Sequence, residues 1–282
     1  MKIKRTLILL LIINSLLLSC KKEENTGKKY EPKFAVEGWI ENEGYPHVIL
    51  TRNVPFFSDL DSAQLANVVL RWAKVTVSDG ETSEILTSRK DDNYFPSYIY
   101  KGSKIKGEIG KTYTLTIEYL DTLLTSTTMI PKPVPLDSIW FEGKNDTLAQ
   151  LNIRFQDPPD KNYYKIYTKT SLDKRYIPTL LSNHDDKFFN GKKYTLQINK
   201  GAENNLSTKK EPYFKINEEV LVKISTIPKN GFDFWNSFQN EILNSSNPLI
   251  GSTGEIMSNI QGPALGVWCG YGSSIYKVKA TP

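Results

Sequence analysis

Two short stretches place a serine three residues before a lysine, the spacing of the nucleophile and its partner in some serine acylases. These stretches are Ser207–Lys210 and Ser274–Lys277. The companion motifs of such enzymes are missing from the chain. Because the chain is rich in serine and lysine, two chance matches are unremarkable, and neither one predicts a catalytic site.

Histidine and carboxylate chemistry has little support either. The chain has two histidines, His47 and His184, which lie far apart in sequence without nearby cysteines. This inventory argues against zinc and against a histidine-centred catalytic site. Four aspartates without the alternating spacing of a calcium-binding loop are interpreted as turn residues, namely Asp157, Asp160, Asp185 and Asp186. We therefore predict a non-enzymatic protein with no metal site and no cofactor.

The clearest predicted chemistry is at Cys20. This residue follows a basic start and an apolar run over residues 7–18, which is too short to span a membrane as a helix. The preceding tripeptide, Leu17-Leu18-Ser19, resembles the lipobox of bacterial lipoproteins. That resemblance implies that residues 1–19 are a cleaved signal peptide and that Cys20 receives a diacylglyceryl group and an acyl chain such as palmitate. The alternative is an ordinary secretory signal that ends at a cysteine by chance.

Charged residues follow the cysteine. Lys22, Glu23 and Glu24 resemble the surface-export signal of Bacteroidota lipoproteins, a lysine followed by two acidic residues. This resemblance implies a protein on the outer face of the outer membrane. The alternative is a charged, solvated tether, and under both interpretations residues 20–32 form a flexible linker.

The charge balance and the second cysteine further limit the classes of function that we expect. The whole chain has 36 cationic and 31 acidic side chains. Three of the cations and no acid lie in residues 1–19, so the mature chain has 33 against 31, a net charge of +2. That balance gives no reason to expect nucleic-acid binding. Once Cys20 is lipidated, Cys269 has no partner, and we predict that it is a buried apolar residue.

Residues 33–130 show short alternating segments at roughly ten-residue spacing, which predicts an immunoglobulin-like or transthyretin-like β-sandwich. The predicted strands are 33–40, 47–51, 74–78, 85–87, 94–100, 111–119 and 122–130. Residues 56–67 contain helix formers after a proline and are predicted to form a long loop with a short helix.

Residues 131–135 contain three prolines and are predicted to link this sandwich to a second β-rich domain over residues 136–282. The alternative is an edge segment within one larger domain. Predicted strands of the second half are 136–141, 149–155, 163–170, 176–181 and 219–226, with Asn190-Gly191 as the turn of a further hairpin.

The C-terminal part of the chain departs from the strand pattern. Trp235, Phe238 and Ile242 have the spacing of one helix face, which predicts a helix near residues 232–244. Residues 262–272 are glycine-rich without the context of a phosphate-binding loop, and they are predicted to form tight turns and close backbone approaches.

Taken in order, several segments resemble a family of Bacteroidota outer-membrane lipoproteins defined by a domain of unknown function. The segments span nearly the whole mature chain and are 34–38, 74–80, 110–115, 186–192, 232–243, 258–262 and 266–268. The family usually has a tighter glycine pair near its end, where this chain has Pro263-Ala264. The resemblance implies two β-rich halves and an association with TonB-dependent outer-membrane transporters, and it carries no established catalytic residues.

Two sets of candidate sites remain. Four Asp-Ser or Asp-Thr stretches resemble the O-glycosylation acceptor of Bacteroidota exported proteins, which makes Ser62, Thr122, Ser138 and Thr147 candidates. Aromatic residues of expected loops are candidate ligand contacts, with core packing as the alternative for each: Phe56, Phe57, Tyr94 and Phe95.

These observations together predict a lipid-anchored, non-enzymatic surface protein that captures a ligand, or acts as a lid, beside a TonB-dependent transporter. A structural or adhesive surface module without a transporter is the alternative. A surface hydrolase is a third class, which the missing histidine-centred site disfavours.

Overall fold

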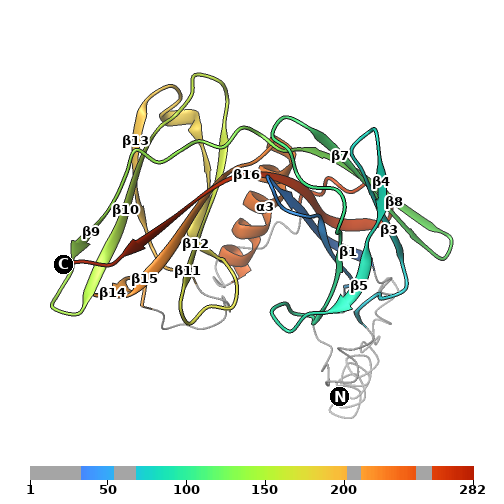
Figure 1. Cartoon of the computed structure of the whole chain (residues 1–282), viewed down its shortest axis with the longest axis horizontal. Helices are drawn as coiled ribbons and strands as arrows, with labels where there is room; N and C mark the ends of the chain where they lie inside the picture. Colours follow the sequence, from blue (N-terminus) through green and yellow to red (C-terminus); the bar gives the residue numbers. More distant parts are fainter. Residues whose placement is uncertain (1–32, 54–67, 202–210, 246–255) are drawn as a thin grey trace, which may run out of the picture. The chain divides into compact units, whose positions relative to one another are not determined.

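The computed structural model describes residues 33–53, 68–201, 211–245 and 256–282 (Figure 1). The predicted signal peptide and the whole tether lie outside these residues, as do Ser207–Lys210 and the loop with Phe56, Phe57 and Ser62. The described residues are mainly β with one α-helix in the C-terminal half, which confirms the predicted fold class.

The described part of the N-terminal half contains eight strands, and every segment predicted as a strand there overlaps one of them. They are β1 (Phe34–Glu41), β2 (His47–Arg52), β3 (Lys74–Ser78), β4 (Ser83–Ile85), β5 (Thr87–Lys90), β6 (Tyr98–Lys101), β7 (Thr112–Tyr119) and β8 (Thr122–Met129). The segment predicted at 85–87 is divided at the buried Leu86, because β4 pairs with β3 while β5 pairs with β6 in another sheet.

The C-terminal half contains the remaining strands, a short 3-10 helix and the α-helix. These elements are β9 (Ser138–Gly143), β10 (Leu148–Gln156), β11 (Tyr163–Thr170), β12 (Ile177–Asp185), η1 (Asp186–Phe188), β13 (Lys193–Ile198), β14 (Phe214–Lys215), β15 (Glu219–Thr226), α3 (Lys229–Ser245) and β16 (Ala264–Lys279).

An eight-stranded sheet joins the two halves in the order β12-β11-β15-β16-β1-β2-β6-β5. Its central strand, β16, has 16 residues. Residues Ala264 to Tyr271 pair in parallel with β1, and residues Gly272 to Lys279 pair antiparallel with β15. Figure 1 shows β16 extending from β1 to β15 across the described part of the chain. The last strand therefore closes the N-terminal half as well as its own half.

Two smaller sheets cover one face of this large sheet and enclose two separate cores. One has the order β4-β3-β7-β8, and the other contains β13, β10, β14 and β9. Trp268 of β16 is fully buried in the first core, where its indole N–H donates to the Tyr113 carbonyl at 3.0 Å. The second core contains Phe155, Tyr164 and Phe214. The residues predicted as a linker connect β8 to β9, and Val134 among them is buried in the second core.

The helix α3 packs on the opposite face of the large sheet, because successive side chains of a strand alternate between faces. Trp268 points into the first core, whereas its neighbours Val267 and Cys269 contact the helix side with Phe234. Cys269 is buried and free, as predicted. The Gly231 Cα lies so close to this cysteine that an added Cβ would stand 2.4 Å from its sulfur.

The predicted hairpin at Asn190-Gly191 is wrong. Residues before this turn form η1 rather than a strand, and β13 after it pairs with β10. Side-chain oxygens hold the irregular segment, since Asp185 Oδ1 accepts from the Lys187 N–H at 2.8 Å and buried Asp157 Oδ2 accepts from the Gly191 N–H at 2.9 Å. These aspartates are structural residues of turns, as predicted.

The glycine-rich tail forms β16 rather than tight turns, so that expectation is also wrong. The expected close backbone approach is confirmed. A Cβ on Gly270 would stand 2.3 Å from the Met129 carbonyl oxygen, and one on Gly272 would stand 2.0 Å from that of Pro131. The glycines therefore allow the end of β8 and the segment after it to cross directly over β16.

Candidate ligand-binding cavity

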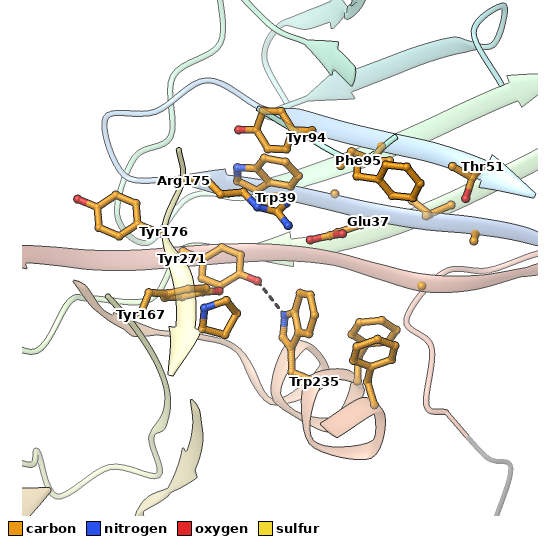
Figure 2. Close-up of a pocket in the computed structure, with 18 of the residues that line it drawn as sticks. Glu37, Trp39, Thr51, Tyr94, Phe95, Tyr167, Arg175, Tyr176, Trp235 and Tyr271 are labelled. Atoms are coloured by element: carbon orange, nitrogen blue, oxygen red, sulfur yellow. Dashed lines mark hydrogen bonds between the residues drawn. The ribbon is translucent and has the colours of Figure 1, made fainter. Parts of the chain in front are cut away.

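A cavity of about 820 Å³ lies on the face of the large sheet that carries α3. Its lining comes from β1, β2, β6, β11, β12, β15, β16 and α3, together with the segment 91–96 before β6 and residues 174–176 before β12. This volume is within the range of ordinary small-molecule sites. Figure 2 shows the lining side chains from these elements converging on one space.

The floor of the cavity is formed by alternate residues of β1. Val36, Gly38 and Ile40 are buried toward the first core, so the intervening residues Glu37 and Trp39 point into the cavity. A Cβ on Gly38 would stand 2.8 Å from the Trp268 ring, which explains why the core side of β1 has no side chain at that position. The sheet register thus fixes which side chains the ligand space receives.

Aromatic rings form much of the wall. Trp39 lies 5.7 Å from the Tyr94 ring between centroids, and Trp235 of α3 lies 6.2 Å from Phe238. The Trp235 indole N–H donates to the Tyr271 hydroxyl at 2.8 Å, the dashed line in Figure 2. Rings held in this way offer rigid contact area to a ligand at a low entropic cost.

Two of the predicted ligand contacts, Tyr94 and Phe95, line this cavity. The strand expected from residue 94 begins only at Tyr98, because Asp91 Oδ1 accepts from the Asn93 N–H at 3.1 Å and starts a turn. Phe95 consequently stands on a loop with 71% of its surface exposed. Phe56 and Phe57 lie outside the described residues.

Charged groups concentrate at the cavity. Six cationic side chains line it, against three carboxylates: Lys101, Lys165, Lys169, Lys174, Arg175 and Lys223 against Glu37, Glu41 and Asp91. Two of these acids form ion pairs, Glu41 with Lys223 at 2.6 Å and Asp91 with Lys101 at 3.2 Å. The lining therefore has an excess of positive charge.

Glu37 lies at the centre of the floor. Its side chain is exposed to the space of the cavity, where the surrounding protein desolvates the carboxyl. This desolvation raises the pKa of the Glu37 carboxyl, and the nearby charges of Arg175 and Lys165 lower it less strongly.

Lys165 is an unusual member of the lining because it is only 2% exposed. Its Nζ donates to Ser182 Oγ at 3.2 Å and to Asn183 Oδ1 at 3.0 Å, and it lies 4.1 Å from the centroid of the Trp235 ring. Burial lowers the pKa of Lys165 to about 7, and nearby Glu37 acts in the opposite direction. The lysine can therefore exchange a proton near neutral pH.

Sequence reasoning missed Glu37, Lys165 and Arg175. A usable signal was present in β11, where alternate residues Tyr163, Lys165, Tyr167 and Lys169 repeat an aromatic–cation pattern on one face. Such a face on a strand between two paired neighbours is unusual unless it borders a polar cavity. Arg175 and Glu37 offered no comparable pattern.

The other predicted residues lie elsewhere. Thr122 begins β8, exposed Ser138 begins β9, and exposed Thr147 donates its hydroxyl to Asn145 Oδ1 at 3.0 Å. None of the three lines the cavity, and their glycosylation stays a prediction.

The serine–lysine stretch in β16 does not assemble a site. Ser274 and Lys277 are three residues apart in a strand and so point to opposite faces, and Lys277 pairs with Glu219 at 2.9 Å. His47 and His184 lie on β2 and β12, which four other strands separate in the sheet. Burial lowers the pKa of each to about 4. No group of three or more potential metal ligands occurs among the residues that the structure describes.

The fold and this site define a β-sandwich protein with a ligand-sized cavity on the outer face of a shared sheet. The chain belongs to the DUF4249 family, a domain of unknown function whose model matches residues 22–274. No curated protein matches the chain. Within the described ranges, no helix has the length and apolar character needed to cross a membrane.

Proposed function

We propose that this protein is a non-enzymatic, lipid-anchored protein of the bacterial outer membrane that faces the cell surface and captures a ligand for a TonB-dependent transporter. The observation that supports capture most directly is the cavity of about 820 Å³ with its rigid aromatic walls and charged groups. Among the described residues, the cavity lining includes no serine, cysteine or histidine, which favours binding over catalysis there.

The anchor is supported by the sequence. An apolar leader that ends at Cys20 resembles a lipobox, and Lys22, Glu23 and Glu24 resemble a surface-export signal. Each methylene buried in the bilayer contributes about 0.8 kcal/mol, so several acyl chains would hold the folded part firmly at the membrane. The tether of residues 20–32 would give the cavity freedom to approach a neighbouring membrane protein.

The transporter partner is supported by the family resemblance, because the resembling lipoproteins tend to accompany TonB-dependent transporters. A binding protein next to such a transporter raises the local ligand concentration at the entry of the pore. A capture role thus accounts for both the lipid anchor and the cavity.

Affinity purification of the tagged full chain from its native host tests this role. We expect a TonB-dependent transporter to co-purify with the wild-type protein in mild detergent. Cys20→Ala is the matched control, because it leaves the folded part unchanged but removes the site of lipidation. We expect this variant to leave the membrane fraction and to lose the transporter. Purification of the lipidated wild-type protein without any transporter would contradict the accessory role and favour the structural or adhesive alternative.

A further inference from the structure

The two ends of the cavity differ in chemistry. Along the floor, parallel pairing places Leu265 beside Ala35 at one end and Tyr271 beside Glu41 at the other. These ends are about 20 Å apart at the usual rise of a strand. Antiparallel pairing adds Thr51 beside Ala35. Figure 2 shows Phe95 on the Thr51 side of the cavity and Tyr176 on the opposite side. The end of the cavity at Ala35, Leu265 and Thr51 is therefore mostly apolar.

The other end is cationic and rich in hydroxyl groups. Lys223 Nζ lies 4.6 Å from the ring centroids of both Tyr167 and Tyr176, and it holds Glu41 in an ion pair. Arg175 lies 6.0 Å from the centroid of the Tyr94 ring, and Figure 2 shows its guanidinium extending from the Tyr176 side toward Glu37. The lining as a whole has more cations than carboxylates, so the cavity attracts negative charge, and Lys223 and Arg175 belong to this end.

The hydroxyl groups at this end are hydrogen-bonded to their neighbours. An indole N–H can only donate, so the Tyr271 oxygen accepts the bond from Trp235. Tyr271 is in turn hydrogen-bonded to the hydroxyl of Tyr167. A hydroxyl can donate as well as accept, so Tyr167 can offer its proton to an acceptor in the cavity. A carboxylate, sulfonate or phosphate supplies such an acceptor, whereas a cation or a bare donor does not.

We propose that the ligand is an amphipathic anion, with its acidic group at the Arg175 end of the cavity and a flat apolar body between Phe95 and the aromatic face of α3. This inference rests on the proposed capture function and names the class of ligand. The aromatic walls contact the flat body, and the excess cations with the Tyr167 hydroxyl bind the acidic group.

A pair of fluorescent probes tests the charge requirement. 8-Anilinonaphthalene-1-sulfonate is an amphipathic anion, and N-phenyl-1-naphthylamine has the same aromatic body without the sulfonate. We expect the purified full chain to bind the sulfonate about tenfold more tightly or better, because a charge-assisted contact contributes at least that much. Raising the salt concentration should weaken binding of the sulfonate and leave binding of the amine unchanged.

Three substitutions locate the probe. Arg175→Gln should weaken sulfonate binding about tenfold with little effect on the amine, and Phe95→Ser should weaken both probes. Glu37→Gln should strengthen sulfonate binding, since it removes a like charge from the floor. The control variants are Lys187→Gln and Phe188→Ser, a neighbouring cation–aromatic pair that lies outside the cavity lining and whose Phe188 is 84% exposed.

The outcomes separate this inference from the capture function. If the amine binds as tightly as the sulfonate and Phe95→Ser weakens both, the cavity captures ligands but the anionic class is wrong. If the control variants change sulfonate binding as much as Arg175→Gln does, the probe binds elsewhere and the inference is overturned. Absence of binding by both probes overturns it as well. The salt dependence of the wild-type protein needs no variant, so the test stands even where a substitution impairs folding.

Discussion

At the scale of single residues, Lys165 is a cation whose environment differs strongly from water, because it is only 2% exposed. Its ammonium is enclosed by Ser182, Asn183 and the Trp235 ring, and burial lowers its pKa from the ordinary value of 10.5 to about 7. In the unfolded chain the lysine regains its ordinary pKa. The unfolded state therefore binds more protons than the folded state at every pH between these two values.

The stability of the protein should consequently rise with pH in this window. We predict that wild-type protein gains up to about 1.4 kcal/mol of unfolding free energy per pH unit relative to Lys165→Met between pH 7.5 and 10. The comparison with a variant that cannot titrate at this position removes the contribution of all other groups. Urea unfolding of both proteins at several pH values measures the difference. Parallel pH profiles would show that Lys165 keeps an ordinary pKa in the folded protein.

Single residues also show how much of the candidate cavity could be predicted from the sequence. Tyr94 and Phe95 could be proposed because aromatic rings offer rigid contact area, with core packing as the alternative, and both line the cavity. Glu37 could not be proposed, since a glutamate at an alternate position of a strand usually faces solvent. Its position at the cavity depends on α3 and the residues before β6 and β12, which only the tertiary structure brings together.

At the scale of elements, β16 explains why the tail was misread. Glycines suggest turns when they are read one at a time. Here Gly270 and Gly272 occupy even positions of one strand, on the core face where residues 129–133 cross, whereas Gly266 has a φ of +145° and its added Cβ would meet Val36 of the paired β1. The glycines stand at alternate positions, as residues on one face of a strand do. This spacing could be interpreted as a strand only once the segment that crosses β16 was known. By contrast, β3, β11 and β15 were predicted with their observed bounds because local alternation is sufficient for them.

A single added methyl group tests this crossing. Gly272→Ala should lower the free energy of unfolding by about 2–3 kcal/mol, because the new Cβ would meet backbone atoms that cannot rotate away. Gly143→Ala is the matched control in β9, since its Cβ would stand at an ordinary 3.5 Å from the nearest atom. We expect that control to change stability by less than about 0.5 kcal/mol. Equal destabilisation of the two variants in denaturant titrations would contradict a close crossing at β16.

At the scale of the whole described unit, the two halves share their last strand. The predicted boundary at residues 131–135 separates β8 from β9, but the first core depends on residues from beyond that boundary, including Trp268. A fragment that ends at the boundary also leaves one edge of β1 without its partner. Exposed apolar core and an unpaired strand edge both favour unfolding or aggregation.

We therefore predict that residues 33–135 expressed alone do not fold cooperatively, whereas the same residues fold when the missing strand is restored. The restored variant places residues 256–271 before residue 33 and joins them through a flexible linker of about 15 glycine and serine residues, because the two parallel strands need a connection about one strand long. Far-UV circular dichroism and urea unfolding of both fragments measure the difference. If the short fragment unfolds cooperatively and is as stable as the restored fragment, the N-terminal sandwich folds without β16. The shared strand would then join two halves that are already complete.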